Sequence, residues 1–190
     1  MNTMEHQRRE TAPSVWSVDR GETCVQFTVK TFWGLATVRG RFDRFAGSYA
    51  VTPEGTNIEL VLDAGSLDTG NATRDKHLRS EDFFDAAGHP ELRFASSRVW
   101  PADDGTLLVE GGLEAAGKLV PLRFVAHVRP VEDGLEVTAE TQIDQKLLGM
   151  SSGPLGMIRR PALVSVKAHL RPEWHQTDAE AEEWLGTASS

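Results

Sequence analysis

The sequence predicts an all-β protein: a single antiparallel β-barrel of about eight strands, closed on itself, with one short helix. Three observations support this fold. Apolar and polar residues alternate with a period of two over most of the chain, which is typical of strands with one buried face. Several of these runs exceed the about five or six residues of an average strand. Short turn sequences join them, and closure into a barrel pairs the edges of long antiparallel strands.

The predicted elements follow one another along the chain. Alternating runs cover residues 25–30, 37–42, 58–63, 91–94, 122–129, 137–143 and 164–170. Turn sequences lie at 52–55, 102–106 and 132–134. Val125 interrupts the polar side of its run. Residues 75–85, DKHLRSEDFFD, lack the alternation and predict a helical turn or two.

Length and charge limit the domain organisation and the partners. A chain of 190 residues fits one compact domain. We expect a flexible N-terminus over 1–13, the barrel domain over 14–172 and an acidic C-terminal tail over 173–190. With 20 Lys and Arg against 28 Asp and Glu, the net charge is −8, which argues against nucleic acid and against anionic membrane surfaces.

The N-terminus and the overall hydropathy bear on location. No stretch approaches the length of apolar residues needed to span a bilayer, so we expect no stable membrane insertion. The N-terminal segment contains Glu5 and Glu10 and lacks an apolar run, so it does not resemble a signal peptide. We therefore expect a cytoplasmic protein.

The sequence carries no enzyme signature. It contains neither a phosphate-binding loop nor a nucleophile elbow, and His77 and His89 lack the short helical spacing that brings two histidines onto zinc. The single cysteine, Cys24, lies in an alternating stretch and is interpreted as a packed residue. We therefore expect no catalytic residue, no metal and no cofactor.

The barrel interior has two interpretations. A barrel of about eight strands either fills with side chains or holds one slender ligand. Inward positions include large Phe27 and Phe94 but also small Gly40 and Ala139, so the pattern leaves both interpretations open.

Residues 66–94 also have two interpretations. They form either a strand connection that closes one barrel end, or a lid whose cationic side chains meet an anionic head group.

Motifs within and before this segment resemble a known family. The most specific are SLDT at 66–69, RDxHL at 74–78 and SxDFFD at 80–85, and VRGRFDRFAG at 38–47 precedes them. The sequence resembles the YceI-like proteins, bacterial polyisoprenoid-binding proteins with a lipocalin-like barrel. The resemblance covers approximately residues 16–170, and its later motifs are weaker. Where the family frequently has Arg after Ile-Asn or Ile-Asp, this chain has Gln145, which leaves the head group open.

The resemblance implies that the interior binds a long isoprenoid or a similar fatty amphiphile. The residues expected to line it are Phe27, Val29, Phe42, Phe45, Leu60, Leu62, Phe83, Phe84, Phe94, Leu122 and Phe124. We expect Arg74, His77 and Arg79 near the head group at the mouth. Segment 148–157, rich in Gly and Met, is either a second part of the rim or a loop without ligand contact.

Three hypotheses on function remain at this point. The first is non-enzymatic binding, transport or storage of an isoprenoid or other long-chain amphiphile. The second is a stress-response or interaction module whose barrel core is filled. The third is a small enzyme or haem protein built on the barrel. Because YceI-like proteins often form dimers, a homodimer is also an expectation.

Overall fold

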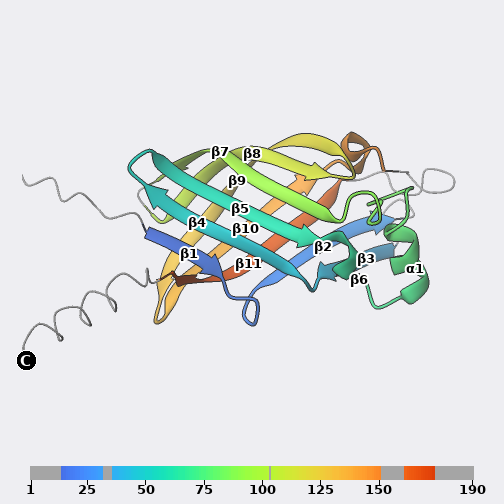
Figure 1. The fold of residues 1–190 in the computed structure, drawn as a ribbon, viewed down its shortest axis with the longest axis horizontal. Helices are drawn as coiled ribbons and strands as arrows, with labels where there is room; N and C mark the ends of the chain where they lie inside the picture. Colours follow the sequence, from blue (N-terminus) through green and yellow to red (C-terminus); the bar gives the residue numbers. More distant parts are fainter. Residues whose placement is uncertain (1–13, 32–35, 103, 151–160, 174–190) are drawn as a thin grey trace, which may run out of the picture.

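An antiparallel sheet closes on itself to form a barrel in the computed structural model, which describes residues 14–31, 36–102, 104–150 and 161–173 (Figure 1). The strands are β1 (Ser14–Val18), β2 (Cys24–Thr31), β3 (Ala36–Phe42), β4 (Phe45–Thr52), β5 (Gly55–Asp63), β6 (Leu67–Asp68), β7 (Glu91–Pro101), β8 (Thr106–Ala115), β9 (Lys118–Val131), β10 (Gly134–Ile143) and β11 (Ala162–Pro172). The helices are α1 (Ala72–Leu78) and two short 3-10 helices, η2 (Ala64–Ser66) and η3 (Gln145–Leu148).

Pairing between the first and last strands closes the barrel. The ring runs β1-β4-β5-β7-β8-β9-β10-β11, and β1 pairs again with β11. Farther along the same edge of β11 lies β2, so β1 and β2 act as one interrupted strand. Their partners β4 and β3 form a second interrupted strand. The expected closed antiparallel barrel of about eight strands with one short helix is therefore confirmed.

Strand pairing in the barrel wall is interrupted beside β3. Among the described residues, the second edge of β3 pairs only with the two-residue β6, through Arg41 with Asp68 and Phe42 with Leu67. The chain between β5 and β7, which contains η2, β6 and α1, lies beside this edge and covers that end of the barrel (Figure 1). The β4–β5, β7–β8 and β9–β10 turns lie at the opposite end (Figure 1).

The helix begins three residues earlier and ends seven residues earlier than the sequence pattern predicts. It begins after Asn71, whose side-chain oxygen accepts a hydrogen bond from the backbone N–H of Arg74 at 3.0 Å and so caps the first turn. It ends at Leu78, and the following residues form turns in which the backbone N–H of Phe84 donates to the Leu78 carbonyl at 3.0 Å. The predicted boundaries of 75–85 were wrong because the cap precedes the apolar residues that suggested the helix.

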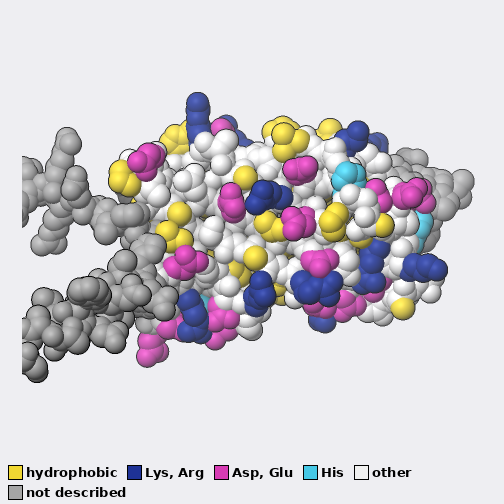
Figure 2. All heavy atoms as spheres, viewed as in Figure 1, with side chains coloured by type: hydrophobic (Ala, Val, Ile, Leu, Met, Phe, Trp, Pro, Cys, Tyr) yellow, Lys and Arg dark blue, Asp and Glu magenta, His cyan; other side chains and the backbone are white. Residues whose placement is uncertain are grey.

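Alternation along the strands correctly separates the inner and outer faces. On β3, Gly40 and Phe42 are buried, while Arg39 and Arg41 are exposed. Val125, which interrupts the polar run, lies outward and is 43% exposed. Acidic and basic side chains are interspersed over the outer surface (Figure 2). A barrel wall with this arrangement has a polar outer face and an apolar interior.

Two further observations concern the ends of the chain and the membrane. The expected N-terminal segment 1–13 and all but the first residue of the expected tail 173–190 lie outside the described residues. The backbone N–H of that first residue, Glu173, donates to the Val15 carbonyl at 2.8 Å. Within the described part of the chain, none of the helices has the length and apolar character required to span a bilayer.

Candidate functional site

A cavity of about 170 Å³ lies inside the barrel. Its apolar lining consists of Val25, Phe27, Val29, Phe42, Leu60, Leu62, Leu78, Phe83, Phe84, Leu92, Phe94, Leu113, Leu122, Phe124, Ala139, Ile143, Leu148, Met150, Ala162, Val164 and Val166. The polar residues that border it are Glu140, Thr141 and Gln145, and the side chain of Glu140 is exposed. The wall is therefore almost entirely hydrocarbon.

The cavity occupies only the half of the barrel nearest α1. On β8, Leu113 lines it, whereas Leu107 and Val109 toward the other end do not. On β9, Leu122 lines it, whereas Ala126 does not. In the far half, Val109 is fully buried and Ala126 is 2% exposed, and both belong to the hydrophobic core. The sequence did not decide between a hollow and a filled interior. The structure shows a cavity in the half nearest α1 and buried core side chains in the other half.

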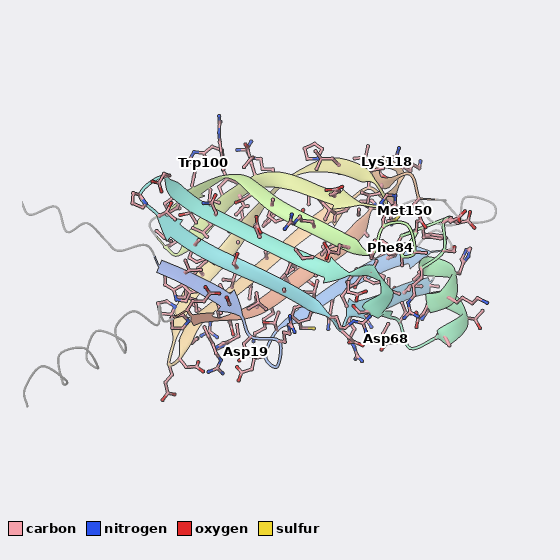
Figure 3. All side chains as sticks on the ribbon, viewed as in Figure 1. Asp19, Asp68, Phe84, Trp100, Lys118 and Met150 are labelled. Carbon is pink, nitrogen blue, oxygen red and sulfur yellow. The ribbon has the colours of Figure 1, made fainter. Side chains whose placement is uncertain are left out.

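The end of the cavity nearest α1 is closed by side chains from outside the barrel ring. Leu78 and Phe84 come from α1 and the turns that follow it, and Leu148 and Met150 come from η3 and the residues after it. Figure 3 shows Phe84 and Met150 at the same end of the barrel. Because these segments are not part of the sheet ladder, fewer backbone hydrogen bonds hold this end than hold the barrel wall.

Two glycines allow aromatic rings to lie against the cavity wall. A Cβ on Gly40 would lie 2.4 Å from Cζ of Phe27, which is the cross-strand partner of Gly40. A Cβ on Gly111 would lie 2.7 Å from Cζ of Phe94. A Cβ on Gly111 would also lie 2.3 Å from the Ala95 carbonyl oxygen, so a larger residue at either position would displace a ring or the neighbouring backbone.

Most of the residues expected to line the interior border this cavity. They are Phe27, Val29, Phe42, Leu60, Leu62, Phe83, Phe84, Phe94, Leu122 and Phe124. Phe45 differs: it is buried, with 7% of its surface exposed, but it belongs to the packed core and does not line the cavity. Phe45 opens β4, just beyond the break that follows Phe42, which accounts for its position outside the cavity.

Arg74, expected near a head group, is bound to the loop that precedes its own helix. Its Nε donates to Oγ1 of Thr69 at 2.8 Å, and its Nη2 donates to the Thr69 carbonyl at 2.9 Å. The carboxylate of Asp75, which is 6% exposed, accepts from the Thr69 backbone N–H at 3.0 Å. Much of the motif at 66–78 therefore stabilises the connection between β6 and α1.

His77 and Arg79 also contact neighbouring parts of this segment. The His77 ring packs edge-on against Phe83, with ring centroids 4.9 Å apart. Nη2 of Arg79 donates a hydrogen bond to the Leu67 carbonyl. Neither these two residues nor Arg74 lines the cavity, and their contact with a head group stays a prediction.

Thr141 and Gln145 are polar cavity residues that the sequence analysis did not select. Thr141 continues the inward alternation of β10, which is the signal that would have identified it. Gln145 begins η3, just beyond the strand, where alternation gives no direction. Leu148 and Met150, within the proposed rim segment 148–157, also line the cavity, and residues 151–157 of that segment lie outside the described residues.

The strongest charge effects lie on the outer face. Hydrogen bonds from Arg129 and Lys167 lower the pKa of Glu136 from 4.5 to about 2. The side chain of Arg44 lowers the pKa of Asp63. Within the described residues, no group of three or more His, Cys, Asp and Glu is placed to hold a metal ion. The cavity is suited to bind hydrocarbon.

A closed antiparallel barrel with an apolar internal cavity defines a class of protein, the lipocalin-like binding barrels. Residues 16–171 match the YceI-like domain, and the chain belongs to this family. A UPF0312 protein of Vibrio parahaemolyticus is 35% identical over 97 residues, covering 50% of this chain and 51% of the relative. One of Shewanella denitrificans is 35% identical over 106 residues, covering 54% and 55%. The matches span about half the length of these relatives.

Solved structures share the fold at low sequence identity. BcnA of Burkholderia cenocepacia has a TM-score of 0.72 and 19% identity, over 80% of this chain and 98% of its own. A polyisoprenoid binding domain from Saccharophagus degradans, implicated in plant cell wall breakdown, has a TM-score of 0.68 and 16% identity, over 83% and 98%. These similarities establish the barrel fold, and membership of this binding-domain family supports a binding role.

Proposed function

We propose that this protein binds an isoprenoid or another long-chain amphiphilic lipid in the barrel cavity and transports or stores it without catalysing a reaction. The observation that carries the proposal is the cavity in the half nearest α1, whose lining is almost entirely apolar. The polyisoprenoid binding domain of similar fold supports the choice of ligand class. Cytoplasmic location and a homodimer remain predictions.

Burial of hydrocarbon supplies the binding free energy in this proposal. Each buried methylene contributes about 0.8 kcal/mol, whereas association costs about 4–15 kcal/mol in lost freedom of motion. Several isoprene units are therefore needed before binding becomes favourable. Affinity is expected to rise with chain length until the available cavity is filled.

The size of the cavity indicates where a long chain must be accommodated. At about 170 Å³, it is similar to the engineered apolar cavity of about 150 Å³ that binds benzene. A longer chain must displace side chains or continue past the mouth. The side chains of Leu78, Phe84 and Met150 are suited to this adjustment, because they come from segments outside the barrel ring.

A filled-barrel interaction module is the competing function, and a ligand test separates it from lipid binding. The protein is purified from cells and examined by native mass spectrometry for bound lipid. It is then titrated with the neutral fluorescent probe N-phenyl-1-naphthylamine, which geranylgeraniol should displace. We expect a co-purifying amphiphile and competitive displacement of the probe.

A matched pair of variants on β10 ties this binding to the cavity. Ala139 lines the cavity, so Ala139→Phe should fill it and weaken probe binding by about tenfold or more. The adjacent Thr138 lies on the outer face, so Thr138→Phe should leave binding unchanged. Binding that is absent in the parent protein, or that survives Ala139→Phe at full strength, would contradict the proposal.

A further inference from the structure

We infer that the cavity has a polar pole, formed by Gln145 with Thr141, that selects amphiphiles with a neutral head group bearing a carbonyl or hydroxyl oxygen. This inference rests on the proposed lipid-binding function and specifies the ligand further. Apart from Glu140, whose side chain is exposed, these two are the polar residues among the described lining of the cavity.

The side chain of Gln145 has an unused hydrogen-bond donor. Its nitrogen Nε2 is buried and has no hydrogen-bond partner among the described residues. Two other buried nitrogens share this condition, Nε of Arg79 and Nε2 of His169. Of the three residues, only Gln145 borders the cavity.

The other two nitrogens belong to side chains that already have polar partners. The guanidinium of Arg79 already donates to the Leu67 carbonyl through Nη2. The ring of His169 lies between two carboxylates, with Nδ1 at 3.4 Å from Glu22 and Nε2 at 3.0 Å from Asp133. A buried amide donor without an acceptor is unfavourable, so the Gln145 donor is available for a ligand oxygen.

The backbone around Gln145 holds the side chain at this place. The Gln145 carbonyl accepts from the backbone N–H of Met150 at 3.2 Å, and it also accepts from that of Gly149. The side chain of Asp144 accepts from the Lys146 backbone N–H at 3.0 Å and caps η3. The position of the donor therefore follows from a defined turn of 3-10 helix.

The charges around the cavity favour a neutral head group. The described lining contains no Lys or Arg, and its one charged residue is Glu140, an acid with an exposed side chain. A carboxylate or phosphate inside the cavity at Gln145 would lose its hydration without gaining a cation from the lining, because neither Lys118, whose Cε lies 3.6 Å from the position of a Cβ on Gly149, nor Lys146 lines the cavity. A carbonyl or hydroxyl oxygen needs only the amide donor, and a hydroxyl can also donate to the amide oxygen.

The test compares isoprenoids of equal chain length in displacement of N-phenyl-1-naphthylamine at pH 7. The three competitors are geranylgeraniol, geranylgeranoic acid and the corresponding hydrocarbon. We expect the alcohol to bind about three- to tenfold more tightly than the hydrocarbon, the gain of one neutral hydrogen bond, and the acid to bind most weakly. In Gln145→Leu, the alcohol should fall to the affinity of the hydrocarbon.

Control variants separate a specific effect from a general one. Gln142 is exposed on the outer face of β10, the strand that precedes η3, so Gln142→Leu should keep the full preference for the alcohol. Gln145→Met removes the donor with a different side-chain shape and should reproduce Gln145→Leu. Both Gln145 variants should bind the hydrocarbon as the parent protein does, which shows that the cavity is intact.

The possible failures point to different conclusions. If none of the three competitors displaces the probe, lipid binding itself is wrong. If all three bind with equal affinity, or if Gln145→Leu and Gln145→Met keep the preference for the alcohol, lipid binding stands and the polar pole is wrong. Tightest binding of the acid would also overturn this inference and would favour a head group held by Arg74 and Arg79.

Discussion

Glu136 lies on the outer face of β10, between a cation from each neighbouring strand. Its Oε1 accepts from Nε of Arg129 at 2.8 Å, and its Oε2 is 3.1 Å from Nζ of Lys167. Hydrogen bonds from Arg129 and then Lys167 lower the pKa of Glu136 from 4.5 to about 2. Because the folded protein favours the ionised form, this carboxylate contributes stability above pH 4.5 that is lost as the pH falls toward 2.

The substitution Glu136→Gln tests this contribution. We expect the variant to unfold at a lower Tm than the parent at neutral pH, because Gln cannot pair with the two cations as a charge. The difference in Tm should narrow as the pH falls from 4.5 to 2, because the parent then loses the same charge. Glu132→Gln, in the exposed β9–β10 turn, is the control. A difference that stays constant over this pH range would contradict the assignment.

Single positions differ in how much of their role the sequence reveals. Alternation predicts that Phe27 and Phe124 point inward, because successive side chains of a strand face opposite sides. It predicts the same for Phe45, which also points inward but meets packed core in place of open space. It gives no direction for Gln145, which follows the end of a strand. What a side chain contacts depends on partners that are distant in sequence.

The connection from β6 to α1 depends on Thr69 and the side chains that converge on it. The carboxylate of Asp75 accepts from the Thr69 backbone N–H at 3.0 Å and from its hydroxyl at 2.5 Å. Arg74 donates to the same hydroxyl and to the Thr69 carbonyl. These bonds fix the start of α1, the element that brings Leu78 to the cavity.

Removing the carboxylate should loosen this element. In Asp75→Ala the partly buried N–H and hydroxyl of Thr69 lose their acceptor, at a cost of about 1–3 kcal/mol or a fall in Tm of about 3–10 °C. Calorimetry measures the change. The exposed Asp82, in the turns after α1, supplies the control, since Asp82→Ala should change Tm by less than about 2 °C. Equal effects of the two substitutions would rule out this role for Asp75.

At the level of elements, strands are more predictable than the helix. The strand positions follow from a local period of two, which needs no knowledge of distant residues. The helix boundaries depend on hydrogen bonds, from the cap at Asn71 to the contacts with Thr69, that involve residues with no apolar periodicity. The sequence therefore locates a helical segment but misplaces its ends.

The two halves of the barrel differ in packing although one set of strands builds both. Leu107 and Leu113 illustrate this on β8, because both are buried, at 5% and 8% exposure, but only Leu113 borders the cavity. A side chain next to open space has fewer atoms in contact than one in a filled core. The halves should therefore respond differently to the loss of the same side chain.

Truncation of these two leucines measures the difference. We expect Leu107→Ala to lower the free energy of unfolding by about 3–5 kcal/mol, near the upper end of the range for such changes. Leu113→Ala should cost about 2 kcal/mol, because its neighbours already border a cavity. Denaturant titration of the protein without ligand compares them. A larger loss for Leu113→Ala would show that the hollow half is packed in solution.

Closure of the whole barrel was predictable, whereas its division into halves was not. Long one-sided strands joined by short turns favour a closed sheet, because closure removes unpaired edges. Which inward residues share a level of the barrel depends on the register between strands, such as Leu113 opposite Val120 and Gly111 opposite Leu122. Register is a long-range property, so Leu107 and Leu113 look equivalent in the sequence.

The cavity lies in the half of the barrel nearest α1, where side chains from outside the barrel ring close it. If the proposed lipid binds there, its hydrocarbon tail enters first and leaves last, and its oxygen-bearing end lies beside Gln145. Uptake and release then follow the same route in opposite directions, and both require the side chains of Phe84 and Met150 to part. The rate of lipid exchange should therefore depend on movement of these two side chains. A protein or membrane that receives the lipid would contact its oxygen-bearing end before its hydrocarbon tail.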